Sequence, residues 1–379
     1  MKKKHLLAPG PTPLFPGAVQ EMSGPIVHHR TPEFASILEE VREGLKYLFQ
    51  TDNDVLLFCS SGTGAMEGAV TNFLSPGDKA LVVKGGKFGE RWGELCQAYG
   101  VEVVAIEVPW GQAADPQEVA ARLRRCPEAK AVFVQASETS TGACHGVQAI
   151  GEIVRDHERT ILVVDAITAL GVFPLQTDAW GLDVVVAGSQ KALMLPPGLA
   201  LVGVSQKAWR LAEEARLPRY YFDFQKERQA LAKNQNAYTP AISLVMGLRE
   251  VLREIKREGL EAIFSRHERL ARATRAAMKA LGLELYAPDS PSPAVTAVKV
   301  PPGVDGAAIP KVLREEFGIM IAGGQDRARG KIFRITHMGY IEIFDIITVT
   351  AALEMVLKRW GWEAPFGRGV GAALTAYHE

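Results

Sequence analysis

The sequence lacks an excess of charge of either sign: 43 lysine and arginine residues are balanced by 43 aspartate and glutamate residues. Proteins that bind nucleic acid or an anionic membrane usually carry a basic excess, so this balance supports neither partner. No apolar stretch approaches the length that spans a bilayer. The lysines at positions 2–4 are not followed by an apolar segment of signal-peptide length, so we expect a cytoplasmic protein.

Cysteine is also scarce, and its spacing excludes two further classes of protein. The four cysteines, Cys59, Cys96, Cys126 and Cys144, form no CxxC pair and stand at no metal-ligand spacing from a histidine. Neither a zinc site nor a disulfide framework is indicated, and we expect no metal. The chain has no internal repeat and no low-complexity tract.

What the sequence does contain is a regular alternation of apolar and amphipathic segments. Valine-rich runs that are apolar throughout predict strands covered on both faces, and the stretches between them have helical patterns. This alternation predicts an α/β fold with a mainly parallel sheet wrapped by helices. The runs cover residues 55–59, 80–84, 101–106, 131–136, 161–166, 183–188 and 199–204, and the helical patterns cover 65–73, 89–99, 116–125 and 148–157.

The texture changes after about residue 239, which indicates a second, smaller domain. A long charged helical stretch at 243–281 precedes three strand candidates (295–300, 318–323 and 331–336) and a helix near 346–360. Glutamates alternate with the arginines of the charged stretch, so it predicts a salt-bridged face in contact with water rather than a basic patch. We expect an N-terminal arm (1–20), a large domain (21–245) and a small α+β domain (246–379). The glycine-rich tail after Trp362 is expected to be mobile or to dock on a neighbour.

The segment Gly188-Ser-Gln-Lys191 places a lysine just after the strand expected at 183–188. Open α/β sheets bind their ligands beyond the carboxyl ends of the strands. A lysine that is partly desolvated there has a lowered pKa, and its neutral amine can form a Schiff base with an aldehyde. Taken alone, an ordinary surface lysine is the simpler interpretation.

Asp165 ends the strand expected at 161–166, 26 positions before Lys191. An acid there could hold the protonated pyridine nitrogen of pyridoxal 5'-phosphate (PLP), although a turn or helix-capping aspartate is an equal alternative. One strand–connection–strand unit separates the two residues, so they can reach one pocket from different strands. The pair predicts a PLP site more strongly than either residue does.

The segment 60–67, SSGTGAME, follows another strand and opens a helix. Its glycines let the backbone approach an anion, and the helix start offers free N–H groups and a positive dipole end, as a phosphate requires. Two alternatives stay open: a plain glycine-rich turn, and a dinucleotide fingerprint, because Gly62, Gly64 and Gly68 form GxGxxxG. The next strand lacks the terminal acid typical of NAD sites, so an NADP-dependent reductase is the alternative function.

Two more segments at strand ends fit a PLP site. Phe88, in GKFG, could stack on a pyridine ring, although a core phenylalanine is the simpler interpretation. The segment 138–142, ETSTG, offers hydroxyl donors for a ring oxygen, with a polar turn as the alternative.

With these segments in this order, the chain resembles the fold-type I PLP enzymes, specifically the class V aminotransferases of the alanine–glyoxylate, serine–glyoxylate and serine–pyruvate group. The resemblance covers nearly the whole chain. It runs from PGPTP (9–13) and HHR (28–30) through SSGTGAMEGAV, GGKFGER, ETSTG, VVDAITALG and GSQKALMLPPG to GIMIAGG and GKIFRITHMG. GSQKAL combined with VDA is highly specific, whereas the glycine loop alone is not.

The resemblance implies a role for each matching residue. Lys191 would be the Schiff-base lysine and would move the proton between the substrate Cα and the cofactor, and Asp165 would pair with the pyridine nitrogen. Arg334, in KIFRITH, would bind the substrate α-carboxylate through a bidentate fork, although alone it resembles a strand-surface charge. The other implied cofactor contacts are Ser61, Gly62, Thr63 and Gln190 at the phosphate, Phe88 and Ile167 on the two ring faces, and Thr139 at the ring hydroxyl.

The resemblance also implies a homodimer with its sites at the subunit interface. Thr239, in AYTPAIS, matches the family threonine that reaches the phosphate of the partner subunit. The neighbouring family tyrosine is displaced, because Asn236 takes its aligned place while Tyr238 is adjacent to the threonine. Either residue could contact the phosphate.

The activity implied is transamination from a small amino acid, serine or alanine, to glyoxylate or pyruvate. Ureidoglycine–glyoxylate and aminoethylphosphonate–pyruvate aminotransferases are alternatives, and in the latter Arg334 would bind a phosphonate. A cysteine desulfurase needs a nucleophilic cysteine well after the Schiff-base lysine, and here all four precede Lys191. The presence of both Lys191 and Asp165 counts against a non-catalytic scaffold of the same fold.

Overall fold

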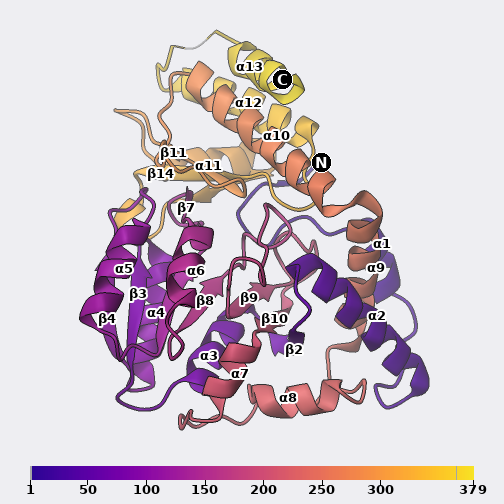
Figure 1. Cartoon of the computed structure of the whole chain (residues 1–379). Helices are drawn as coiled ribbons and strands as arrows, with labels where there is room; N and C mark the ends of the chain where they lie inside the picture. The colour runs from indigo at the N-terminus through magenta and orange to yellow at the C-terminus, as the bar shows by residue number, and fades with distance from the viewer. Residues whose placement is uncertain (1, 364) are drawn as a thin grey trace.

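A seven-stranded sheet in the order β2-β10-β9-β8-β5-β3-β4 dominates the computed structural model, which describes residues 2–363 and 365–379 (Figure 1). Within it β10 runs antiparallel to β2 and β9, and the other neighbours are parallel. The mainly parallel α/β fold is therefore confirmed, as are all seven strands expected from the apolar runs. The strands are β2 (Asp54–Ser60), β3 (Lys79–Lys84), β4 (Glu102–Glu107), β5 (Ala131–Gln135), β8 (Ile161–Asp165), β9 (Val184–Gly188) and β10 (Gly198–Val204).

Helices cover the sheet, so its central strands have no exposed face. Every residue of β5, β8 and β9 is buried, which is why their sequences are apolar without alternation. The four helices expected between the strands are present as α3 (Gly62–Phe73), α4 (Lys87–Ala98), α5 (Pro116–Arg125) and α6 (Val147–Arg155). The other elements of this part are α1 (Pro16–Met22), α2 (Pro32–Phe49), α7 (Gln206–Ala212), α8 (Phe224–Leu231) and the short hairpin of β6 (Ser137–Glu138) and β7 (Ala143–Cys144).

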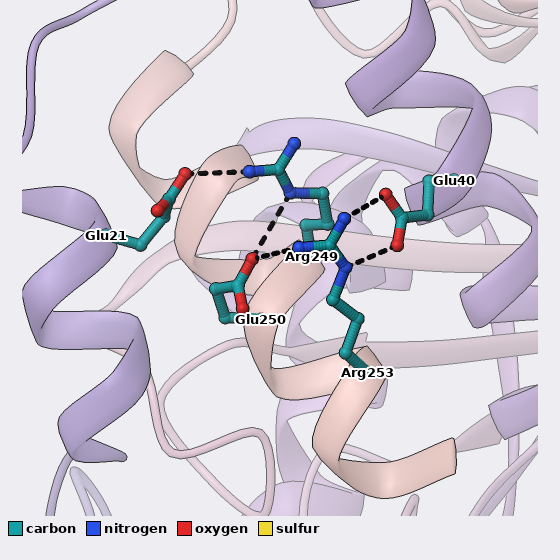
Figure 2. A network of polar contacts seen from close by, with 5 residues as sticks. All are labelled: Glu21, Glu40, Arg249, Glu250 and Arg253. Atoms are coloured by element: carbon teal, nitrogen blue, oxygen red, sulfur yellow. Dashed lines mark hydrogen bonds and ion pairs between the residues drawn. The ribbon is translucent and has the colours of Figure 1, made fainter. Parts of the chain in front are cut away.

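The charged stretch expected as one long helical segment is two helices, α9 (Ile242–Glu258) and α10 (Leu260–Ala280). They are separated by Gly259, whose φ of 86° is a conformation that ends a helix and that glycine adopts without strain. The arginines of α9 pair with glutamates of its own and neighbouring helices, so the predicted salt-bridged face is confirmed. This α9 charge network consists of Arg249, Arg253, Glu21, Glu40 and Glu250 (Figure 2).

A second group of elements gathers at the upper end of the molecule in Figure 1, away from α7 and α8. Its antiparallel sheet has the order β11-β14-β13, and its own hydrophobic cluster joins that sheet to α10, α12 and α13. The N-terminal arm attaches here, because β1 (His5–Leu6) pairs with β12 (Ile319–Met320). The remaining elements are β11 (Val295–Lys299), α11 (Ala308–Val312), a π-helical turn (Leu313–Phe317), β13 (Ala322–Gly323), a 3-10 turn (Asp326–Ala328), β14 (Ile332–Thr336), α12 (Ile343–Arg359) and α13 (Arg368–His378).

The two hydrophobic clusters meet within α10. The last residue of the larger cluster along the chain is Phe264. The smaller cluster contains Leu7 of the N-terminal arm and otherwise residues from Leu270 onward. The domain division proposed at residue 245 falls inside α9 and stays a proposal. Among the described residues, no helix combines the length and the apolar character that crossing a membrane requires.

The expectation for the glycine-rich tail was wrong for residues 368–378. They form α13, which packs against α10 of the same chain. Ala373 is fully buried in the smaller cluster, and Arg272 Nε of α10 donates a hydrogen bond of 2.7 Å to the carbonyl oxygen of Ala376. The glycines and alanines of this segment leave little side-chain bulk, so two helices can approach closely there even though the composition suggests a loose tail.

Candidate active site

A cavity of about 160 Å³ lies beyond the carboxyl ends of β2, β3, β5, β8 and β9. These strands point the same way, so their carboxyl ends share one edge of the sheet, where open α/β folds bind ligands. All the predicted site residues except Thr239 and Arg334 line this cavity. They are Ser61, Gly62, Thr63, Phe88, Thr139, Asp165, Ile167, Gln190 and Lys191, and they are joined by Arg91, Ser137 and Thr168.

Asp165 and Lys191 reach the cavity from adjacent parallel strands. Asp165 is the last residue of β8, and Lys191 follows β9 after a two-residue turn. Burial raises the pKa of Asp165 to about 7, although its Oδ1 accepts a 2.8 Å hydrogen bond from the N–H of Ile167. Burial lowers the pKa of Lys191 to about 8, against the attraction of the Asp165 carboxylate. Both groups therefore change charge near neutral pH, which acid–base chemistry requires.

The N-terminal arm lies directly against this lysine. Lys191 Nζ donates a hydrogen bond to the carbonyl oxygen of Pro9, and Thr12 Oγ1 donates one of 2.7 Å to the carbonyl oxygen of Lys191. Gly10 has a φ of 119°, and a Cβ there would overlap the lysine side chain. This backbone conformation favours glycine, and the close approach makes the PGPTP segment part of the site although it is far away in sequence.

The start of α3 offers hydrogen-bond donors to the cavity. Ser61 stands at the N-cap, but its hydroxyl caps no backbone group, so the first N–H groups of the helix have no side-chain partner there. Gln190 lines the same region, and its Oε1 is buried without a hydrogen-bond partner among the residues that the structure describes. An uncapped helix start with hydroxyls beside it fits a phosphate group. With Asp165 for a ring nitrogen and Lys191 for an aldehyde, these residues fit PLP.

Phe88 is positioned through the buried carboxylate of Glu138. The backbone N–H groups of Phe88 and Gly89, at the start of α4, donate to Glu138 Oε2 at 3.1 and 3.0 Å. Ser140 donates to Oε1 from both its N–H (3.1 Å) and its hydroxyl (2.6 Å). Burial raises the pKa of Glu138, and these four donors oppose that rise because they stabilise the charged form. Glu138 thus anchors the helix end that carries the aromatic ring.

Arg334 is buried in β14 and does not line the cavity, but it contacts a residue that does. Its Nη1 donates to the carbonyl oxygen of Thr139 at 2.8 Å. Its Nε and Nη2 donate to the carbonyl oxygen of Gly323 at 3.0 and 2.8 Å. These bonds fix the plane of the guanidinium group and use three of its five N–H donors.

Thr239 lies apart from the cavity of its own chain. It shares a separate cleft with Cys59, Tyr221, Asn236 and Tyr238. Asn236 is buried and donates to Glu227 Oε1 at 2.7 Å, whereas the Tyr238 ring stacks on Tyr221 with 5.2 Å between their centres. The single chain therefore does not bring Thr239 to the other predicted cofactor contacts.

The sequence interpretation missed Arg91 and gave Glu138 no role. Arg91 lies on α4, three residues after Phe88, and this helical spacing is a signal that both face one side. Glu138 carried no such signal, because the Gly89 and Phe88 backbone groups that it anchors lie 49 and 50 positions away. In residues 2–363 and 365–379, no group of three or more histidine, cysteine, aspartate or glutamate side chains is placed to bind a metal.

Known proteins match this chain over most or all of its length. The aminotransferase class-V family model matches residues 18–341. Serine–glyoxylate aminotransferase of Methylorubrum extorquens is 36% identical over 100% of this chain and 96% of its own length. The soluble hydrogenase 42 kDa subunit of Anabaena cylindrica is 47% identical over 99% of this chain and 98% of its own. The crystal structure of ureidoglycine–glyoxylate aminotransferase from Bacillus subtilis superposes with a TM-score of 0.95 at 32% identity, covering 100% of this chain and 99% of that one.

Proposed function

This chain belongs to the aminotransferase class-V family and is a transaminase, and we propose that it uses PLP to move the amino group of serine or alanine to glyoxylate or pyruvate. The observation that carries the proposal is the placement of Asp165 and Lys191 in one cavity with the uncapped start of α3. An acid for the pyridine nitrogen, an amine for the aldehyde and donors for the phosphate are the contacts that PLP needs.

When bound, PLP supplies an aldehyde that links to amines and a ring that withdraws electrons from the substrate Cα. Lys191 would hold the cofactor through its Nζ until an amino acid takes its place. The freed amine would then remove the proton from the substrate Cα and deliver it to the cofactor carbon that is linked to the substrate nitrogen. Because burial lowers the pKa of Lys191 to about 8, a sizeable fraction of this amine is neutral near physiological pH and can accept a proton.

Asp165 would keep the ring nitrogen protonated. Its Oδ1 is already held by the N–H of Ile167, which fixes the orientation of the carboxylate. Burial is the main cause that raises the pKa of Asp165 to about 7, and a cationic nitrogen beside it would favour the charged carboxylate again. Ile167 and Phe88 line the same cavity and would pack on the two faces of the ring, with Thr139 at its hydroxyl group.

Arg334 would bind the substrate α-carboxylate. Its two remaining N–H donors are available to an acceptor, while the bonds to Thr139 and Gly323 prevent the guanidinium from rotating. Because Thr139 also lines the cavity, this contact would place the carboxylate beside the ring and expose the Cα–H bond to Lys191.

We further propose a homodimer in which Thr239 serves the cavity of the partner subunit. Two observations support this. Thr239 does not line its own cavity, and the aromatic side chains next to its cleft, Tyr220 and Tyr221, are 73% and 39% exposed. Exposed aromatic groups of this kind are common at subunit interfaces.

The test is a donor and acceptor panel on the purified protein. Serine, alanine, aspartate, ureidoglycine and aminoethylphosphonate are each combined with glyoxylate or pyruvate, and the loss of the donor is followed. We expect a yellow protein with the visible absorption of a lysine-linked PLP and the fastest loss for serine or alanine with glyoxylate. A colourless protein that consumes no donor would overturn the proposal, and oxidation of bound NADPH would favour the reductase.

A further inference from the structure

Arg91 is an unpaired cation on a helix whose other charges are paired. Lys87 of α4 pairs with Glu94 of the same helix and with Asp326, and Glu90 pairs with Arg327. Arg91 forms no ion pair with any residue in the described part of the chain, although it is half-buried and lines the cavity. The chain therefore brings a positive charge into the cavity without tying it up in an ion pair.

The surroundings of Arg91 fix where this charge lies. Its Nη1 donates a 3.2 Å hydrogen bond to Thr63 Oγ1, in the first turn of α3. Its guanidinium carbon is 4.9 Å from the centre of the Phe88 ring, a distance typical of a cation–π contact. The helix end that carries Phe88 is anchored in turn by the buried Glu138. Arg91 is thus held beside the uncapped start of α3.

The residues already assigned to the phosphate do not balance its charge. Ser61, Gly62, Thr63 and Gln190 are all neutral. A phosphate monoester carries a charge of about −1.5 to −2 at pH 7, whereas a helix start supplies only about +0.5. Lys191 would be taken by the aldehyde and already donates to the carbonyl oxygen of Pro9, whereas Arg334 does not line the cavity and is held by the carbonyl oxygens of Thr139 and Gly323. Among the cavity-lining residues, Arg91 remains as the cation for the anionic end.

We propose that Arg91 binds the phosphate group of the cofactor, and that Phe88 and Thr63 hold its guanidinium in place for this contact. The planar guanidinium offers two parallel N–H donors, which match two phosphate oxygens. The inference rests on the proposed PLP function of the cavity. It adds a phosphate-binding residue that also contacts Phe88, the side chain proposed to stack on the cofactor ring. Through Arg91, the phosphate contact would therefore influence the orientation of the Phe88 ring.

The experiment compares PLP with pyridoxal, which has the same ring and aldehyde but no phosphate. Both are titrated into cofactor-free wild type, Arg91→Gln and Arg91→Lys, and binding is followed by the absorption of the lysine-linked ring. Arg91→Gln is expected to weaken PLP binding by about tenfold to a hundredfold and to change pyridoxal binding by less than about twofold. Arg91→Lys, which keeps the charge without the fork, is expected to recover part of the PLP affinity. The matched control is Arg122→Gln on α5, where a half-buried arginine away from the cavity pairs with Glu118 and both ligands should bind as in wild type.

Three outcomes would overturn the inference. Equal weakening of PLP and pyridoxal would mean that Arg91 acts only by orienting Phe88. Unchanged PLP binding with a raised KM for aspartate alone would mean that Arg91 binds a second carboxylate of the donor. If neither Arg91 variant weakened PLP binding more than pyridoxal binding, Arg91 would not contact the phosphate. If circular dichroism shows that Arg91→Gln does not fold, the test uses Arg91→Lys instead. The ratio of its PLP affinity to its pyridoxal affinity is then compared with that of the wild type. Wild type that binds neither ligand would refute the proposed function itself, which separates that failure from this one.

Discussion

The candidate active site and the outer face of α9 use the same kinds of side chain in opposite ways. On α9 the charges of the network pair with opposite charges close to water, as Figure 2 shows for Arg253 and Glu40, whose side chains are 49% and 43% exposed. In the cavity, Asp165 is buried and Lys191 is half-buried, and neither forms an ion pair with another residue of the described ranges. The first arrangement favours the charged forms, because the hydrogen bond between Glu40 and Arg253 lowers the pKa of the carboxyl group and raises the pKa of the guanidinium group. The second moves the pKa values of Asp165 and Lys191 toward neutrality.

Solvent exposure and the partners within reach, and not charge itself, separate structural from chemical roles in this chain. An exposed ion pair contributes about 0–1 kcal/mol, because water screens the attraction and ordering two long side chains costs entropy. A buried carboxylate or amine has no such screening, so its charged form is costly until a ligand compensates it. Each of the following substitutions tests one side of this contrast, from the largest expected effect to the smallest.

Lys191→Ala removes the amine on which the proposed chemistry of the candidate active site depends. We expect kcat to fall by about 10,000-fold or more, because the nucleophile and the proton carrier are lost together. PLP should still bind through its other contacts, which retention of cofactor after gel filtration would measure. Lys279→Ala, on the exposed face of α10, is the control and should keep full activity. Full transaminase activity in the Lys191 variant would refute the assignment.

Asp165→Asn tests whether the buried carboxylate destabilises the cofactor-free fold. Burial raises its pKa from 3.8 to about 7 in the folded state. Below about pH 4 the carboxyl group is protonated in both the folded and the unfolded state, so it does not lower the free energy of unfolding. As the pH rises from about 4 to about 7, the unfolded state loses this proton first, and the free energy of unfolding falls. Asparagine removes this cost, so the variant should be more stable than wild type at pH 8 by up to about 4 kcal/mol.

Denaturant unfolding of cofactor-free protein across this pH range measures the effect, and the difference should vanish near the acid end. Transaminase activity of the same variant should fall, because the ring nitrogen loses its anionic partner. A stability difference that is the same at every pH would show that the Asp165 carboxylate is not the source of the penalty.

Glu138→Gln tests whether a buried charge can be structural when the backbone satisfies it. An amide group turns one acceptor oxygen into a donor that faces the N–H groups of Phe88 and Gly89 or the Ser140 donors. We expect a loss of about 1–3 kcal/mol in the free energy of unfolding, measured by denaturant titration. Glu94→Gln on the exposed face of α4 is the matched control and should cost less. Equal losses in the two variants would contradict an anchoring role for Glu138.

Arg253→Gln should have the smallest effect. It removes exposed ion pairs with Glu40 and Glu250 (Figure 2), so we expect a loss below about 1 kcal/mol and unchanged kcat. The loss should shrink further at high salt, which screens surface charges. A loss as large as that of Glu138→Gln, or one independent of salt, would remove the distinction between the two regions.

Local sequence was sufficient for much of the fold. Strands buried on both faces need apolar residues at every position, so the valine-rich runs identified all seven strands of the large sheet. The break at Gly259 and the helix at 368–378 were missed for opposite reasons. One glycine inside a strong helical pattern looks tolerable, whereas several glycines and alanines look like a loose tail until a neighbouring helix packs on them.

By itself, the sequence determined the order of strands and helices, the absence of a charge excess, and a lysine and an aspartate at the ends of neighbouring strands. These features depend on local periodicity and on the short connections of an α/β unit. Only the tertiary structure decided that Pro9 and Gly10 lie against Lys191, that Glu138 anchors the helix of Phe88, and that Arg91 enters the cavity without a carboxylate partner. Burial and pairing depend on segments that meet only after folding, because residues far apart in sequence supply both the shielding from water and the partner charges.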